Sequence, residues 1–147
     1  MQTLYRKYRP QLWGEVFGQD VIKNVLENQI LNDKISHAYI FAGSRGIGKT
    51  TIARLFAKTL NCQNRKKDEI EPCNKCESCI AINNSSDLNI IEIDAASYTG
   101  VDNVRELRNI AKIPSSSNKY KIFIIDEAHM LSKAAFNALL KILEEPP

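Results

Sequence analysis

A glycine-rich stretch followed at once by a lysine and a threonine constrains the fold of this chain more than any other feature. Residues 43–50 fit the pattern G-x-x-x-x-G-K-[ST] at every fixed position. The stretch follows a short apolar run, residues 38–42, and precedes residues 49–61, in which apolar side chains recur at helical spacing. The sequence therefore predicts a buried strand, a phosphate-binding loop and a helix in that order.

Each residue type in the loop has a physical reason. Glycines let the backbone turn tightly and point several N–H groups at phosphate oxygens, and the following helix adds its positive end. Lys49 is expected to reach the β- and γ-phosphates of ATP, and the Thr50 hydroxyl to ligate Mg²⁺. We assign nucleotide binding to Gly43, Ser44, Arg45, Gly46, Ile47, Gly48, Lys49, Thr50 and Thr51. The alternative, a glycine-rich turn that precedes a lysine by chance, leaves the strand–loop–helix setting unexplained.

The other elements alternate between helix and strand patterns. Asp20 is expected to cap a helix that runs to about Leu31. The further patterns predict strands at residues 90–93 and 122–125, and helices near residues 102–112 and 133–145. Strands alternating with helices indicate an α/β fold, with a mostly parallel sheet between two layers of helices. We assign residues 1–147 to one nucleotide-binding domain.

Two acidic residues, Asp126 and Glu127, directly follow the last predicted strand. Carboxylates at the carboxyl end of a buried strand are costly to leave unpaired, so they are expected to meet water or a metal ion. In an ATPase with a phosphate loop, such an Asp holds Mg²⁺ and a following Glu polarises the attacking water. We therefore assign Asp126 and Thr50 to Mg²⁺, and Glu127 and Lys49 to catalysis. The alternative is a pair of solvated acids that begins a helix.

Four cysteines lie in residues 62–79, namely Cys62, Cys73, Cys76 and Cys79. Four thiolates can close a tetrahedral structural zinc site, which would order this polar insertion and take no part in catalysis. An iron–sulfur cluster is the rival, but its C-x₂-C-x₂-C run continues with a fourth cysteine and a proline. Here Asn83 occupies that fourth position, so zinc is favoured. Unliganded thiols are the remaining alternative.

Composition and charge narrow the function class. The 147 residues are 44% hydrophobic and 25% charged, which is ordinary for a soluble globular protein. A formal net charge of +3 is too small to indicate nucleic-acid binding, although residues 65–67 concentrate positive charge. No apolar stretch has the length of a membrane span, and the first ten residues lack the core of a signal peptide. We expect a cytoplasmic protein without a membrane partner, whose cysteines bind metal rather than form disulfides.

The motifs together resemble the gamma/tau subunits of the bacterial DNA polymerase III clamp loader. The matching residues are Tyr8-Arg9-Pro10, residues 15–19, His37-Ala38-Tyr39, the phosphate loop, the four cysteines, residues 92–97, residues 126–132, residues 136–141 and residues 143–147. The resemblance covers essentially the whole chain. The cysteine insertion after the phosphate-loop helix is its most specific element, because most related ATPases lack it.

The resemblance implies an AAA+ ATPase that uses ATP with Mg²⁺ and carries a structural Zn²⁺. It implies partners as well: delta, delta-prime and other gamma/tau copies, the sliding clamp, and primer–template DNA. Such a subunit belongs to a DNA-directed DNA polymerase holoenzyme, although this chain contains no polymerase active site. The resemblance also implies that Arg9 and Pro10, and the segment from Val16 through Gly18 to Gln19, cradle the adenine and ribose.

Members of this family continue beyond the position of Pro147 with a strand that carries a polar sensor residue, and then with a Ser-Arg-Cys motif. We therefore expect a fragment of a longer protein that lacks a central strand and hydrolyses ATP poorly alone. Three other functions compete: a helicase, a scaffold subunit that does not hydrolyse ATP, and a DNA-binding zinc finger. A helicase would need further motifs, and a zinc finger would need a recognition helix with paired histidines. A scaffold subunit would have no need of the catalytic residues that this chain carries.

Overall fold

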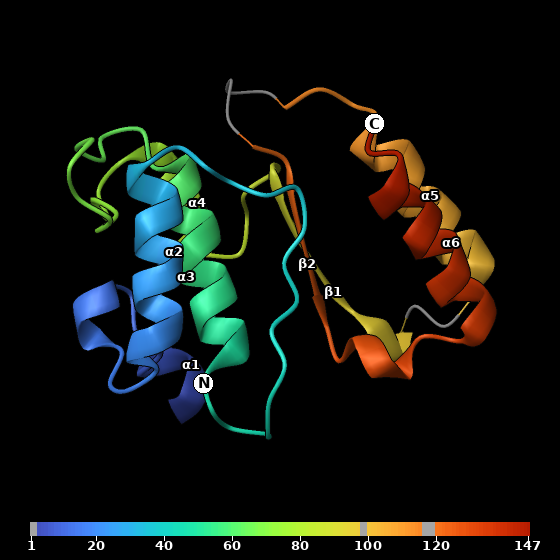
Figure 1. Cartoon of the computed structure of the whole chain (residues 1–147), viewed down its shortest axis with the longest axis horizontal. Coiled ribbons are helices and arrows are strands. Elements are labelled where there is room, and N and C mark those ends of the chain that lie inside the picture. The colour runs from blue at the N-terminus through green and yellow to red at the C-terminus, as the bar shows by residue number, and fades with distance from the viewer. Residues whose placement is uncertain (1–2, 98–99, 116–119) are drawn as a thin grey trace. The chain divides into compact units, whose positions relative to one another are not determined.

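The computed structural model describes residues 3–97, 100–115 and 120–147. The chain forms two compact units: Met1–Ile35 with Phe41–Asp87 make unit 1, and Ser36–Ile40 with Leu88–Pro147 make unit 2. In the described residues unit 1 is helical, whereas unit 2 combines helices with a short sheet (Figure 1). Within these same ranges, no helix has the length and apolar character that crossing a bilayer requires.

Unit 1 carries the phosphate loop and the cysteines on a helical framework. Its described helices are α1 (Leu4–Lys7), α2 (Asp20–Leu31), α3 (Lys49–Asn61) and α4 (Glu77–Asn83), and a 3-10 helix spans Trp13–Glu15. The predicted helices in the regions of α2 and α3 are confirmed. Apolar side chains at helical spacing bury one face of α2, where Leu26 and Ile30 are among the most buried residues. Helix α3 packs on α4.

The predicted cap of α2 is wrong by one residue. Gln19, with a φ of 57°, occupies the cap position, and Asp20 is the first residue of the helix. Gln19 has the left-handed conformation, and no side-chain hydrogen bond caps the helix. The Asp20 carboxylate still lies in the first turn, where the positive end of the helix dipole stabilises it.

Helix α3 is buried beyond its apolar face. Ile52, Leu55 and Phe56 are buried, as their spacing predicts. Lys58 and Thr59 in the second half of the helix are also buried, although their side chains are polar. A buried polar group must find hydrogen-bond partners, so this half of α3 marks a polar core within unit 1.

Unit 2 contains the sheet. Its described elements are β1 (Ile90–Asp94), a 3-10 helix at Ala95–Ser97, α5 (Val101–Ala111), β2 (Ile122–Asp126), a 3-10 helix at Ala128–Met130, and α6 (Lys133–Glu144). Strands β1 and β2 pair in parallel, from Ile90 opposite Ile122 to Asp94 opposite Asp126. Helix α5 packs on α6. The two strands, the parallel pairing and both helices confirm the prediction from the sequence.

The strand predicted at residues 38–42 is wrong. The described residues form a sheet of β1 and β2 only, and residues 38–42 carry no ladder hydrogen bonds. Ile40 is 90% exposed, and the Nε2 atom of His37 lies 3.0 Å from the carbonyl oxygen of Leu143 in α6. Apolar character alone does not make a strand, because the ladder also needs a neighbouring backbone to pair with. The described fold is α/β with a short parallel sheet, and the predicted three-layer arrangement stays a prediction.

Candidate functional site

The phosphate loop turns through glycines in conformations that other residues rarely adopt. Gly46 has a φ of 83° and Gly48 a φ of 91°. Gly48 is the N-cap of α3, so the loop passes directly into the first turn of a 13-residue helix. The loop lies at the surface, with Ser44, Arg45 and Gly46 exposed. Its backbone N–H groups and the positive end of α3 can therefore receive an anion from solvent.

The Lys49 ammonium folds back on this loop. Its Nζ atom donates hydrogen bonds to the carbonyl oxygens of Gly43, at 2.9 Å, and Ser44, at 2.7 Å. Both acceptors are neutral and lie in the loop itself. A phosphate oxygen carries a full negative charge and forms a stronger, charge-assisted hydrogen bond. The lysine can therefore exchange these carbonyls for a phosphate group without losing a buried contact.

The segment that the resemblance assigns to the base and ribose lies in the same unit as the loop. Val16 donates its N–H to the Trp13 carbonyl at 3.1 Å, and the Lys23 ammonium donates to the Val16 carbonyl at 2.7 Å. Gly18 has a φ of 76°, and the Gln19 side-chain amide lies 3.5 Å from the carbonyl oxygen of Ile47 in the loop. Gln19 therefore joins this segment to the phosphate loop.

Arg9 and Pro10 line a small cavity of about 30 Å³ together with Gln11, Arg54 and Lys58, and with Leu55, Ile82 and Asn83. A volume of this size holds a water molecule rather than an adenine ring. Arg9 and Pro10 thus lie beside the polar core of unit 1.

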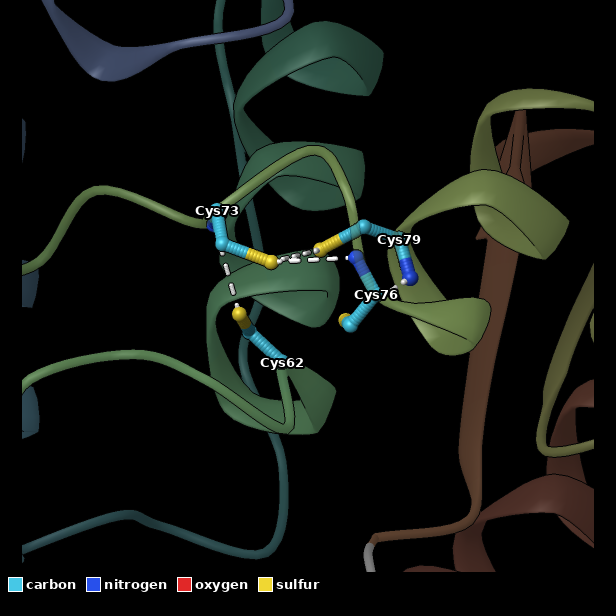
Figure 2. A group of neighbouring side chains, drawn as sticks. All are labelled: Cys62, Cys73, Cys76 and Cys79. Atoms are coloured by element: carbon cyan, nitrogen blue, oxygen red, sulfur yellow. Dashed lines mark hydrogen bonds between the residues drawn. The ribbon is translucent and has the colours of Figure 1, made fainter.

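The four cysteine sulfur atoms converge in unit 1 and all lie within 4.8 Å of one another (Figure 2). Cys62 follows α3, Cys76 caps α4, and Cys79 lies inside α4. The Sγ atoms of Cys73 and Cys79 are 4.0 Å apart. A tetrahedral zinc site with Zn–S bonds near 2.3 Å needs sulfur–sulfur distances of about 3.8 Å. The arrangement therefore fits one zinc ion with four ligands and no open position.

Backbone amides stabilise the thiolate forms of this cluster. The Cys73 N–H donates to Cys62 Sγ at 3.3 Å, and the Cys79 N–H to Cys76 Sγ at 3.4 Å. The N–H groups of Lys75 and Cys76 both donate to Cys73 Sγ. Burial raises the pKa of Cys73, but these two donors, together with side-chain hydrogen bonds to Cys76 and Cys62, lower the pKa to about 6. Burial raises the pKa of Cys79, and a cation bound within the cluster would favour its thiolate form.

The acidic pair ends strand β2. Asp126 accepts a hydrogen bond at Oδ1 from the Glu127 N–H at 3.0 Å, and Glu127 has a φ of 53°. The Oε2 atom of Glu127 lies 3.3 Å from Nε2 of His129, a residue to which the sequence assigned no role. The register also places Asp94 beside Asp126 at the carboxyl end of the sheet. Sequence reasoning missed Asp94, although it ends its strand as Asp126 does.

Comparisons with known proteins agree with these features. A family model described as DNA polymerase III, delta subunit, matches residues 18–147. The chain belongs to this family.

Its relatives include DNA polymerase III subunit tau of Bacillus subtilis, which is 53% identical over 146 residues. The subunit gamma/tau of Mycoplasma pneumoniae and the subunit tau/gamma of Haemophilus influenzae are each 48% identical. Each match covers 99% of this chain, but only 21% to 26% of the relative. The chain thus spans about a quarter of the length of these DNA polymerase III subunits, and its resemblance to gamma/tau subunits is confirmed.

Within this DNA polymerase III family member, the predicted site residues fall into groups. Unit 1 holds the phosphate loop with Thr50 and Thr51, the segment from Arg9 to Gln19, and the four cysteines. Unit 2 holds Asp126 and Glu127. The four cysteines come together, whereas nucleotide binding by the loop and a magnesium site shared by Thr50 and Asp126 stay predictions.

Proposed function

We propose that this chain is the ATP-binding and hydrolysing module of a DNA polymerase III clamp-loader subunit, acting in DNA replication. The phosphate loop carries the proposal: left-handed glycines lead into α3, and the Lys49 ammonium rests on carbonyls that a phosphate can replace. The high identity to gamma/tau subunits supports the clamp-loader assignment.

Each proposed site residue has one task in this reaction. Loop N–H groups and Lys49 would bind the β- and γ-phosphates, and Thr50 and Asp126 would hold Mg²⁺. Glu127 orients a water molecule for attack on the γ-phosphorus and accepts hydrogen bonds from it. These groups stabilise the charge that moves onto the phosphate oxygens as the bond to ADP breaks.

The cysteine cluster serves the proposed module as a structural zinc site. Four sulfur ligands close the tetrahedron and leave no position for a substrate, which is typical of zinc that stabilises a fold. As the resemblance implies, the assembled machine would contain delta, delta-prime and further gamma/tau copies, and would act on the sliding clamp and primer–template DNA.

The runner-up function is a scaffold subunit that binds no nucleotide or does not hydrolyse it. A scaffold has no need of Lys49, Thr50, Asp126 and Glu127, all of which this chain retains. A helicase-like ATPase offers no reason for the cysteine cluster. The clamp-loader function therefore explains more of the chain than either alternative.

Two substitutions test the proposed function. Lys49→Met is expected to weaken binding of MgATP, measured by calorimetry, at least about tenfold, because a charge-assisted contact to phosphate is lost. Glu127→Gln is expected to retain MgATP binding and to slow hydrolysis in the assembled complex, because the amide is a poor acceptor for the attacking water. Lys66→Met, at an exposed lysine of the same unit, is the control. Undiminished hydrolysis by Glu127→Gln would remove that residue from its role.

Metal analysis tests the cysteine assignment. The purified protein is expected to contain about one zinc per chain, and Cys76→Ser is expected to lose most of it. Iron and a brown colour in place of zinc would identify an iron–sulfur protein instead.

A further inference from the structure

The 3-10 helix Trp13–Glu15 is held by carboxylates in addition to its own backbone hydrogen bonds, from the Glu15 N–H to Leu12 and from the Val16 N–H to Trp13. Four consecutive N–H groups, those of residues 11–14, donate to only two side chains. Glu15 Oε2 accepts from Gln11 and Leu12 at 2.7 and 3.3 Å, which is a local contact. Glu71 accepts from Trp13 at 2.9 Å and from Gly14 at 2.8 Å, one amide on each carboxylate oxygen. Glu71 belongs to the cysteine insertion, so this insertion determines half of the hydrogen bonding.

The carbonyl oxygen of Gln11, in the same residues 11–14, is also bound by side chains of unit 1. The Lys58 ammonium donates to the Gln11 carbonyl at 2.7 Å, and the Asn74 side-chain amide donates to the same oxygen at 3.2 Å. Lys58 also donates to Asn74 Oδ1 at 2.6 Å. Asn74 lies between Cys73 and Cys76 and has a φ of 54°, so it forms the turn of the cysteine cluster itself.

Trp13 is tied to the insertion by its side chain as well. Its indole N–H donates to Thr59 Oγ1 at 2.8 Å, and the Thr59 hydroxyl donates to the Ile70 carbonyl at 3.0 Å. Trp13 is 3% exposed. Val16 then bonds to the Trp13 carbonyl, and the Gln19 amide reaches the phosphate loop at Ile47. Hydrogen bonds thus tie the cysteine turn to residues 11–14, and the chain continues from there through Val16 to Gln19, which contacts the loop.

We propose that the cysteine insertion is a brace: its Glu71 and Asn74, together with Lys58 of α3, position residues 11–14 and thereby set the affinity for a nucleotide of the base-side segment, Arg9-Pro10 and residues 16–19. A metal ion held by the four cysteines would fix the turn at Asn74 and the position of Glu71, and these two residues hold residues 11–14, which lead to Val16. Glu71 and Lys58 are positioning residues in this account. The inference rests on the proposed nucleotide binding, but the brace has its own readouts.

One readout is the single tryptophan of the chain. Chelating the metal is expected to expose Trp13 to acrylamide quenching and to shift its emission to the red. It is also expected to speed hydrogen exchange of the Trp13 and Gly14 amides at least about tenfold, because their acceptor is no longer held. Unchanged quenching and exchange in the chelated protein would overturn the brace.

A matched pair of substitutions tests the hydrogen bonds of the Glu71 carboxylate to Trp13 and Gly14 without removing the metal. Glu71→Gln keeps the shape of the side chain but points an NH₂ group at one of the two backbone donors. It is expected to speed exchange of that pair of amides and to weaken MgADP binding about three- to tenfold, with zinc content unchanged. Glu69→Gln removes the same charge two residues away, where the carboxylate pairs with exposed Lys66 at 3.3 Å. Glu69→Gln is expected to match the parent in amide exchange, MgADP affinity and zinc content.

The outcomes separate the two proposals. Should Glu71→Gln and Glu69→Gln behave alike in exchange and in MgADP affinity, the brace is wrong. Should the parent bind no MgADP, the proposed function fails, and exchange at Trp13 and Gly14 still decides the brace. If chelation unfolds the protein, Asn74→Gly supplies the test. Glycine keeps the left-handed turn and the metal, yet removes both contacts of the Asn74 amide; Ser85→Gly, at a φ of 55°, is its control.

Discussion

The two ends of helix α3 each carry a lysine, and the two lysines have opposite environments. Lys49, at the first turn, donates to two backbone carbonyls five and six residues away in an exposed loop. Lys58 is 2% exposed, and four oxygen atoms lie within 3.0 Å of its Nζ atom, so its three N–H groups are fully used; the nearest of these partners in sequence is 16 residues away. The comparison shows that Lys49 is the lysine available to a ligand, because its partners are nearby neutral carbonyl groups that a phosphate can replace.

The C-terminal end of α3 should dominate stability. Lys58→Met is expected to lower the free energy of unfolding by about 3–5 kcal/mol, because the oxygen atoms of Gln11, Asn74 and Asn83 lose the ammonium that joins them. Urea unfolding followed by Trp13 fluorescence measures this change. Lys66→Met is the control, since Lys66 is exposed and its pair with Glu69 contributes at most about 1 kcal/mol. Equal effects of the two substitutions would contradict a polar core at Lys58.

Thr59 also tests the polar core at the C-terminal end of α3, with a smaller expected loss of stability than at Lys58. Thr59→Val keeps the volume but leaves the Trp13 indole N–H and the Ile70 carbonyl without their partner. The expected loss is about 2 kcal/mol in the free energy of unfolding, from the same urea titration. Thr51→Val makes the same exchange near the other end of α3 and is expected to change stability by less than about 0.5 kcal/mol. A loss below that value at Thr59 would show that the indole contact contributes little.

The N-terminal end of α3 was predictable from the sequence, and the C-terminal end was not. The loop motif is contiguous, and Ile52, Leu55 and Phe56 repeat at helical spacing, so local patterns suffice for both. The cysteines were found because their spacing is itself the signal. By contrast, the partners of Lys58 and Glu71 lie up to 47 and 58 residues away. No local pattern distinguishes a buried lysine from a solvated one.

The failed strand at residues 38–42 shows the same limit. Hydrophobic composition indicated burial, but a strand depends on a neighbouring backbone that the run itself does not encode. Strands β1 and β2 were predicted correctly because each supplies the other's partner. The assignment of residues 1–147 to one AAA+ domain stays a prediction.

Substitutions of Gly48 and Gly100 test whether the phosphate loop, before the N-terminal end of α3, depends on the left-handed backbone conformation of its glycine. Gly48 and Gly100 are both helix N-caps, but their φ angles are 91° and −89°. Gly48→Ala is expected to destabilise the protein by about 1–2 kcal/mol more than Gly100→Ala, because only the first forces a side chain into the left-handed region. Thermal unfolding followed by circular dichroism measures the difference. Equal costs would mean that the loop relaxes to another conformation.

Lys49→Met carries the smallest expected change in stability and completes the comparison. Its two acceptors belong to an exposed loop, so water replaces the ammonium when the side chain is apolar, and the free energy of unfolding should change by less than about 0.5 kcal/mol. The same variant should lose MgATP affinity at least about tenfold. Lys58→Met should show the reverse order of effects, with a large loss of stability. If Lys49→Met instead destabilised the protein as much as Lys58→Met, the loop lysine would be part of the fold, and its availability to phosphate would be lost as an argument.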